Sequence, residues 1–159
     1  GLGYPGGPAI DALATQGDPT AVDQPRAMLD ATGDDRYAFS FSGIKTAVVN
    51  TVRKHPRLDT ADVAASYQEA VVDVLVAKAR AAAREVGAGG LCLAGGVAAN
   101  SRLRERFCDV SVSDGVPAHL PSLAMCTDNA AMVAAAAWHQ LRLVGPSPLD
   151  SGASSALRL

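Results

Sequence analysis

The spacing of apolar residues predicts five helices. In the clearest of them, from about 61 to 86, apolar side chains recur every three or four positions, as in an amphipathic helix. Pro8 suits the first turn of another helix, which we expect at about 9–15. The others are predicted at about 44–54, from Ala98 or Asn100 to about Phe107, and at about 127–143, where Thr127 or Asp128 would cap the first turn.

Strands are predicted where apolar positions alternate or form short runs. In the segment 36–42, which reads RYAFSFS, Tyr37, Phe39 and Phe41 alternate with smaller residues, and this is the period of a strand. Short apolar runs predict further strands at 91–94, 109–112 and 118–120. Buried strands between alanine-rich helices indicate an α/β fold.

The same patterns divide the chain into one domain and a tail. The 159 residues, with 48% apolar side chains and a mean hydropathy of +0.13, are enough to bury one core. We expect this domain to span residues 1–145, with a helical segment at about 44–86 and a polar, irregular stretch at 18–33. Residues 146–159 are rich in Ser, Pro and Gly, which predicts a flexible tail.

Charge and cysteine content limit the classes of partner. A formal net charge of -2 gives no general attraction for nucleic acid, so contact with RNA would depend on local patches. Three scattered cysteines do not form a disulfide framework. Since the sequence has neither a signal-like start nor an apolar run of membrane-spanning length, we expect a cytoplasmic protein with no membrane partner.

The segment LCLAGGVAANSRLRERF carries the most informative pattern. A predicted strand leads through Gly95 and Gly96 into a helix, so backbone N–H groups would face open space there. That arrangement suits a phosphate or the edge of a nucleotide, and Asn100 follows one turn later with an amide that can donate and accept. Close packing of a strand on a helix requires the same glycines, so the pattern alone leaves both interpretations open.

Two carboxylates stand at the beginning of predicted helices. Asp11 lies one turn after Gly7 in YPGGPAID, where it could bind ribose hydroxyls, although a solvated aspartate in a first turn is the more common case. Asp128 precedes Asn129 at the start of an apolar helix. It could bind a metal ion, but from the pattern alone a helix cap is favoured.

A cluster of small polar residues surrounds the predicted turn in FSFSGIKTAV. Ser40, Ser42, Lys45 and Thr46 belong to it, and Ser42 with Gly43 would cap the following helix. Lys45 could neutralise a phosphate, but the glycine and lysine spacing of a Walker loop is missing.

The remaining polar groups indicate no side-chain nucleophile. Arg102 and Arg106 share a helix face, which is typical of a solvated surface and less often of contact with an RNA backbone. His55, His119 and His139 have no acidic neighbour at useful spacing. We therefore name no catalytic residue.

In this order, the blocks YPGGPAID, FSFSGIKTAV, LAGGVAANSRLR and CTDNAAM resemble the tRNA N6-adenosine threonylcarbamoyltransferase family, formerly called O-sialoglycoprotein endopeptidases. The resemblance covers nearly the whole chain except the tail. It implies the actin/Hsp70/sugar-kinase-like (ASKHA) fold, of which this chain would be the C-terminal lobe. The implied reaction moves the threonylcarbamoyl group from threonylcarbamoyl-adenylate to N6 of an adenosine beside the tRNA anticodon, with release of AMP.

The resemblance also implies roles for particular residues. Gly7, Asp11 and Asn100 would contact the nucleotide-bearing substrate, beside the bend at Gly95 and Gly96. Asp128 would be a ligand of one divalent metal ion, iron. The implied partners are tRNA, a paralogous subunit of the same fold and an ATPase subunit of the modification complex.

One part of the family pattern is missing from this sequence. The N-terminal lobe, with the HxxxH pair that supplies the other metal ligands, is not in the chain. A lone carboxylate is a poor site for a transition metal, so we expect these 159 residues alone to be inactive and to hold no iron. Tight, stoichiometric iron binding in a calorimetric titration would contradict that expectation.

Three other functions remain to be weighed. The first is a non-catalytic module of the same fold that binds a partner or dimerises. A sugar-kinase-like ATPase is the closest enzymatic rival, and the CTDNAAM block disfavours it. A protease is disfavoured because the sequence contains neither HExxH nor a Ser, His and Asp order typical of such enzymes.

Overall fold

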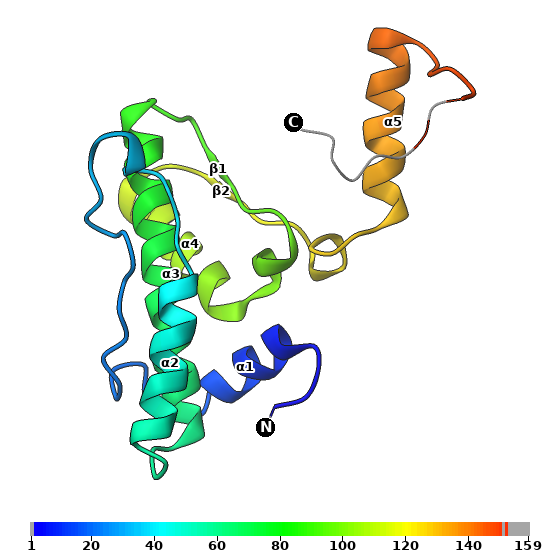
Figure 1. Ribbon diagram of the computed structural model, residues 1–159. Helices are drawn as coiled ribbons and strands as arrows, with labels where there is room; N and C mark the ends of the chain where they lie inside the picture. The colour runs from blue at the N-terminus through cyan, green and yellow to red at the C-terminus, as the bar shows by residue number, and fades with distance from the viewer. Residues whose placement is uncertain (1, 151, 153–159) are drawn as a thin grey trace.

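The computed structural model describes residues 2–150 and 152, and it is mostly helical (Figure 1). Its α-helices are α1 (Gly6–Ala14), α2 (Ser42–Lys54), α3 (Thr60–Glu85), α4 (Ser101–Asp114) and α5 (Ala130–Val144). Short 3-10 helices lie at η1 (Gly33–Asp35), η2 (Gly96–Ala99) and η3 (Leu123–Met125). All five predicted α-helices are therefore confirmed, with shifts at their ends.

Two short strands form a parallel pair around α4. Strand β1 (Leu91–Cys92) pairs with β2 (Ala118–His119), and the Leu91 N–H donates to the carbonyl of Pro117 at 2.8 Å. Parallel strands need a crossover connection, and here η2 and α4 supply it. The predicted strands at 91–94 and 118–120 are confirmed in shortened form, and the β1–α4–β2 unit is compatible with the expected α/β class.

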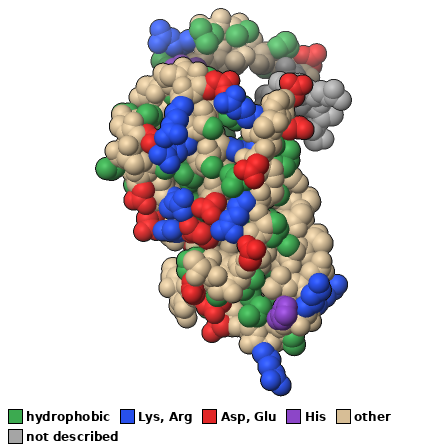
Figure 2. All heavy atoms as spheres, turned by 90° about the vertical axis from the view of Figure 1, so that its left-hand side faces the viewer, with side chains coloured by type: hydrophobic (Ala, Val, Ile, Leu, Met, Phe, Trp, Pro, Cys, Tyr) green, Lys and Arg blue, Asp and Glu red, His purple; other side chains and the backbone are tan. Residues whose placement is uncertain are grey.

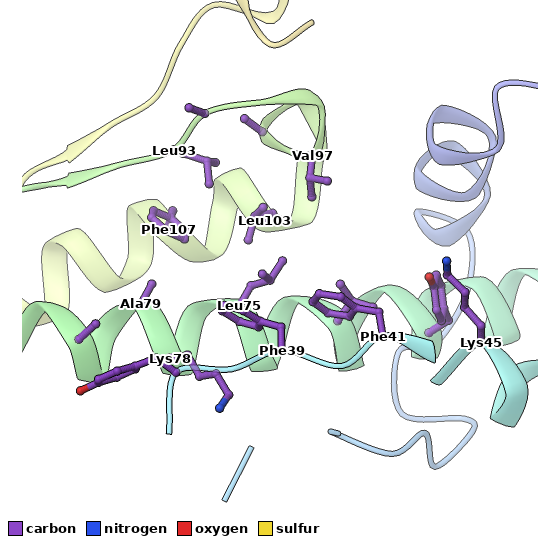
Figure 3. Close-up of a pocket in the computed structure, with 16 residues that line it drawn as sticks. Phe39, Phe41, Lys45, Leu75, Lys78, Ala79, Leu93, Val97, Leu103 and Phe107 are labelled. Carbon is purple, nitrogen blue, oxygen red and sulfur yellow. The ribbon is translucent and has the colours of Figure 1, made fainter. Parts of the chain in front are cut away.

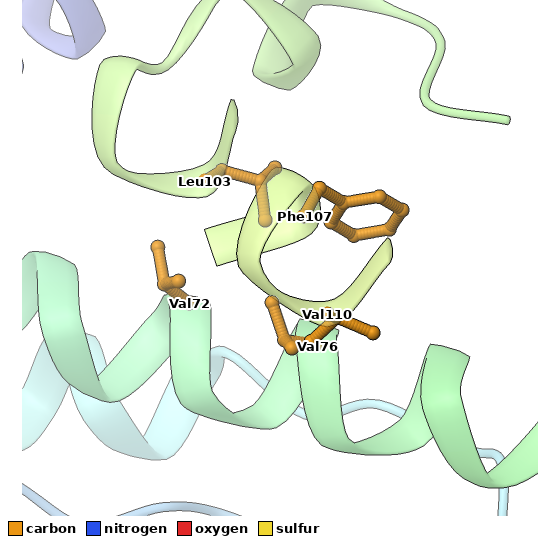
Figure 4. Close-up of a cluster of buried hydrophobic side chains, with 5 residues drawn as sticks. All are labelled: Val72, Val76, Leu103, Phe107 and Val110. Atoms are coloured by element: carbon orange, nitrogen blue, oxygen red, sulfur yellow. The ribbon is translucent and has the colours of Figure 1, made fainter. Parts of the chain in front are cut away.

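Helix α3 is the central element, because α1, α2 and α4 all pack against it. The main core lies between α3 and α4 (Figure 4). There the five buried side chains come from both helices and point toward one another: Val72, Val76, Leu103, Phe107 and Val110. This contact fixes the start of α4, next to the glycine bend, against the rest of the molecule.

A second, smaller contact joins α1 to the beginning of α3. Ala14 packs there with Ala64 and Ala65, and such small side chains let the two helices approach closely. Directly after α1, a Cβ atom on Gly17 would lie 2.1 Å from the carbonyl oxygen of Ala61, so only glycine fits. The contact holds α1 where Asp11 reaches Ser101, the first residue of α4.

Two predicted strands are wrong. Residues 109–112 belong to α4, because Leu103, Phe107 and Val110 recur at helical spacing and bury themselves against α3. The helix continues to Asp114 and ends at Gly115, whose φ of +67° is a left-handed conformation.

Residues 36–41 are not a strand either, and α2 already begins at Ser42. No strand of the described chain pairs with this segment. Instead Phe39 and Phe41 stack on each other with ring centroids 5.9 Å apart. The alternation of aromatic residues thus serves side-chain packing and not a sheet.

The predicted caps also need correction. The N-cap of α5 is Asn129, whose side-chain oxygen accepts from the Met132 N–H at 2.9 Å, so neither Thr127 nor Asp128 caps the helix. Phe41 precedes α2 without a side-chain cap, so the predicted cap at Ser42 is wrong. The predicted start of α4 at Ala98 or Asn100 lies close to the observed one, because the helix begins at Ser101 and Asn100 is its cap.

Helix α5 extends away from the body of the molecule (Figure 1) and buries none of its side chains. After Gly145 the described residues of the predicted tail, 146–150 and 152, form no helix or strand, and the others lie outside the described residues. Among the helices of the described chain, none combines the length and the hydropathy needed to cross a membrane.

Candidate functional site

Four of the five residues predicted to bind a nucleotide line one cavity. Gly7 and Asp11 reach it from α1, while Gly96 and Asn100 reach it from η2 and the cap of α4. The cavity has a volume of about 410 Å³. Its other lining residues are Pro8, Val97, Ala99 and Leu123. The fold therefore joins two sequence motifs that lie some ninety positions apart, and we call this space the glycine-bend cavity.

The backbone at Gly95 and Gly96 forms a bend, as the two glycines predicted. Gly95 has φ +80° and ψ 177°, a region that is accessible almost only to glycine. No heavy atom lies within 4 Å of a Cβ built on Gly7, Gly95 or Gly96, so all three face open space. A flat or anionic group can thus approach the backbone closely at this cavity.

The Asp11 carboxylate joins α1 to the first residue of α4. It accepts from the Ser101 hydroxyl at 2.7 Å and from the Ser101 N–H at 3.0 and 3.2 Å. Asn100 Nδ2 donates to the same carboxylate at 3.1 Å. Three of these four bonds go to Oδ1, so Oδ2 keeps acceptor capacity for a further donor, such as a ribose hydroxyl.

The Asn100 amide is held from both ends. Its oxygen accepts from the Leu103 N–H at 2.9 Å, which caps α4. Its two N–H bonds point to Asp11 and to Gln68 Oε1, the latter at 2.8 Å. An amide has only two such donors, so in this arrangement Asn100 can accept from a ligand but has no donor to offer it. The predicted donating role is therefore not available without breaking one of these bonds.

Sequence reasoning missed two residues of this network. Ser101 carried no signal, because a serine after an asparagine cap is common. Gln68 did carry a signal, because it is a polar residue on the buried face of α3. It shares this face with Ala64 and Val72, and it is 9% exposed. A polar side chain on a buried stripe needs a partner, and here the partner is Asn100.

A second, larger cavity of about 610 Å³ lies beside the first and is lined mainly by apolar side chains (Figure 3). Phe39 and Phe41 border it along α3, with Val97 and Leu103 on the other side. Lys45 also lines this apolar cavity and not the glycine-bend cavity, so the structure does not bring it to the predicted nucleotide site.

The arginines of α4 are bound within the protein. Arg102 and Arg106 both pair with Glu69 on α3, at 2.6 and 2.5 Å. Hydrogen bonding from Arg102 holds the pKa of Glu69 below its ordinary value, although partial burial acts in the opposite direction. These pairs support neither a free solvated face nor contact of this face with RNA.

Asp128 does not join the other predicted site residues. Its side chain is exposed, and it does not line the glycine-bend cavity. Within residues 2–150 and 152, no three His, Cys, Asp or Glu side chains gather closely enough to hold a metal ion. The described donor set therefore does not fit a metal centre by itself, and the role of Asp128 as a ligand stays a prediction.

A comparison with protein-family models identifies the family of this chain. The model described as tRNA N6-adenosine threonylcarbamoyltransferase matches residues 1–135. The match includes the glycine bend, the two carboxylates at Asp11 and Asp128 and the first turns of α5. Since it covers most of the chain, the chain belongs to the tRNA N6-adenosine threonylcarbamoyltransferase family.

Proposed function

We propose that this chain supplies the nucleotide-binding part of an enzyme that transfers the threonylcarbamoyl group from threonylcarbamoyl-adenylate to N6 of an adenosine beside the tRNA anticodon. The family modifies tRNA, and this supports the reaction class. The single observation that carries the residue assignment is the convergence of Gly7, Asp11, Gly96 and Asn100 on one cavity. The parallel β1–α4–β2 unit is compatible with the C-terminal lobe of an ASKHA fold.

The contacts around the cavity favour one orientation of the adenylate. The N-terminus of α4 is already occupied by the Asp11 carboxylate and by the Asn100 cap, so a phosphate gains little there. Asp11 Oδ2 instead suits a ribose hydroxyl. The first N–H groups of η2, at Gly96 and Val97, precede the hydrogen bonds of that helix and suit the phosphate.

The proposed transfer needs little covalent chemistry from the protein. The N6 amine of the adenosine attacks the carbamoyl carbon, the bond from that carbon to the adenylate phosphate oxygen breaks, and AMP leaves as the amine loses a proton. Holding the amine close to the carbamoyl carbon in the reactive orientation can supply a large part of the rate enhancement of the transfer. This agrees with the prediction of no side-chain nucleophile.

The same proposal includes the predicted partners and location. The substrates would be threonylcarbamoyl-adenylate and tRNA, and the enzyme would work in the cytoplasm with a paralogous subunit of the same fold and an ATPase subunit. The proposal also includes one divalent ion, iron, in the full-length protein, with Asp128 as one ligand and the other ligands from outside the described residues. Family membership supports tRNA as the substrate.

A transfer assay with the full protein and its complex tests the proposal. Asp11→Ala should lower the yield of modified adenosine at least tenfold and leave the affinity for tRNA unchanged. Asp23→Ala is a matched control, because that carboxylate is exposed and lies away from the cavity. Equal yields from both variants would contradict the proposed nucleotide site.

One observation favours a second candidate, a module that binds a partner or dimerises. The large apolar side chains of α5 are exposed, with Trp138 at 58% and Leu141 at 54%. Such a helix gains from covering this surface. Light scattering over a range of concentrations tests the idea, since a monomer at every concentration would exclude self-association.

A further inference from the structure

The end of α2 and the turn into α3 form a concentrated basic surface. Residues 42–58 contain no Asp or Glu, and four basic side chains lie within five positions of one another: Arg53, Lys54, His55 and Arg57. All four are exposed. We call these four residues the basic tip. Because the chain as a whole has a net charge of -2, the tip stands out against a more acidic remainder.

Cationic side chains elsewhere in the described chain are mostly bound within the protein. Six arginines form ion pairs, namely Arg26, Arg36, Arg80, Arg84, Arg102 and Arg106. Lys78 and Arg104 donate to backbone carbonyls. The tip residues have no such partner within residues 2–150 and 152. Free positive charge is therefore concentrated at one end of the molecule.

The surface view agrees with this distribution. In Figure 2, Lys and Arg side chains and a histidine gather at the lower right, at the end where Figure 1 places the turn between α2 and α3, while blue and red mix over the middle of the face. The next acidic residues in the sequence form no ion pair with the tip, and their side chains accept from backbone N–H groups instead. Asp59 accepts from the Ala61 N–H, and Asp62 accepts from the Asp18 N–H, each at 2.8 Å.

Helix stability explains only part of this arrangement. Arg53 and Lys54 lie in the last turn of α2, where positive charge stabilises a helix by about 0.3–1 kcal/mol. His55 is the C-cap of α2, but Arg57 lies beyond the helix, outside the last turn in which the dipole acts. Nor does packing require the tip, because Ile44 is the one buried residue of α2. A cluster of exposed, unpaired cations fits an external polyanion.

We propose that the basic tip binds the phosphate backbone of the tRNA substrate. The inference rests on the proposed function, which makes tRNA a substrate, and it adds the surface that holds it. Phosphates along an RNA strand form a closely spaced row of negative charges, and several exposed cations on one turn can contact such a row without reading its sequence. The tip would thus contribute affinity and orientation and leave the choice of adenosine to other contacts.

The test compares two variants of the full protein that change the net charge equally. The tip variant is Arg53→Gln, Lys54→Gln and Arg57→Gln, and the control is Arg36→Gln, Arg84→Gln and Arg142→Gln. The dissociation constant for an unmodified tRNA transcript is measured between 50 and 200 mM salt. We expect the tip variant to bind about tenfold more weakly or worse at the lowest salt and the control to stay within about twofold of the parent. Melting temperatures check that both variants fold.

The salt dependence gives a second readout. Each lost phosphate contact lowers the magnitude of the slope of log K against log salt by about 0.7–0.9, so the slope of the tip variant should be smaller in magnitude by about 2 to 3. A tip variant with the affinity and slope of the control overturns this inference but leaves transfer activity, and so the proposed function, intact. A tip variant that binds tRNA normally but loses a protein subunit also overturns it. A parent protein that binds no tRNA overturns both.

Discussion

Asp11 on α1 accepts hydrogen bonds from both the hydroxyl and the N–H of Ser101, the first residue of α4, at 2.7 and 3.0 Å. The two residues belong to motifs ninety positions apart, and their contact holds α1 against the start of α4 beside the glycine-bend cavity, which Asp11 lines. The carboxylate therefore has two tasks, since it stabilises the start of α4 and offers its second oxygen to a ligand. Variants of the pair can separate these tasks.

Ser101→Ala should destabilise the protein by about 0.5–1.5 kcal/mol, because one hydrogen bond is lost. Asp11→Ala should cost about 1–3 kcal/mol, because Asn100 and Ser101 both lose an acceptor. Urea unfolding measures both. Nucleotide affinity should fall strongly only in Asp11→Ala, and an equal fall in Ser101→Ala would show that Asp11 acts solely through the helix.

The two glycines of the bend should respond differently to alanine. Gly95→Ala forces a side chain into φ +80°, which costs about 1–3 kcal/mol. Gly96 has no positive φ, and a Cβ there meets nothing within 4 Å, so Gly96→Ala should fold like the parent. That methyl would still enter the cavity and weaken nucleotide binding. Thermal melts and a nucleotide titration separate the effects, and unchanged affinity in Gly96→Ala would contradict the assignment.

Acid should weaken the contact between α3 and the end of α4. Hydrogen bonding from Arg80, opposed by desolvation and helped by Arg84, lowers the pKa of Asp114 from 3.8 to about 2. A folded-state pKa below the unfolded value means that the stability is present above about pH 4 and is lost as the pH falls toward 2. In Asp114→Asn the free energy of unfolding should decline less steeply over this range. The same slope in both proteins would refute the pairing.

The core between α3 and α4 should be sensitive to cavities. Leu103 is 2% exposed and packs among Val72, Val76 and Phe107. Leu103→Ala should therefore lower the free energy of unfolding by about 2–5 kcal/mol. Leu149→Ala is the control, because that side chain is exposed, and it should change stability by less than about 0.5 kcal/mol. A small effect at Leu103 would mean that this core does not hold α4 in place.

The helices could be predicted because their apolar spacing extends over several turns. In α3 this pattern persists through 26 residues, so a few exceptions did not hide it. Short segments gave less reliable signals. Residues 109–112 alternate like a strand, yet Val110 also continues the helical spacing from Phe107, and burial against α3 decided in favour of the helix.

The residues of the candidate site could be predicted from the sequence, but the hydrogen bonds between them could not. Glycines at a bend and an asparagine at a cap are local signals, and the cavity at Gly7, Gly96 and Asn100 agrees with them. The bonds from Asn100 to Asp11 and Gln68 depend on how α1 and α3 pack, which no local pattern encodes. Likewise, the apolar composition of α5 predicted a helix but not its exposure.

The most direct measurement of the central claim is an amide NMR titration of the protein with AMP, the product of the proposed transfer. We expect saturable shifts of the amide signals at Gly7, Asp11, Gly96 and Asn100, which line the glycine-bend cavity. Signals beside the apolar cavity, such as that of Leu75, should stay in place. Shifts confined to the apolar cavity, or no shift at millimolar AMP, would contradict nucleotide binding at the glycine-bend cavity.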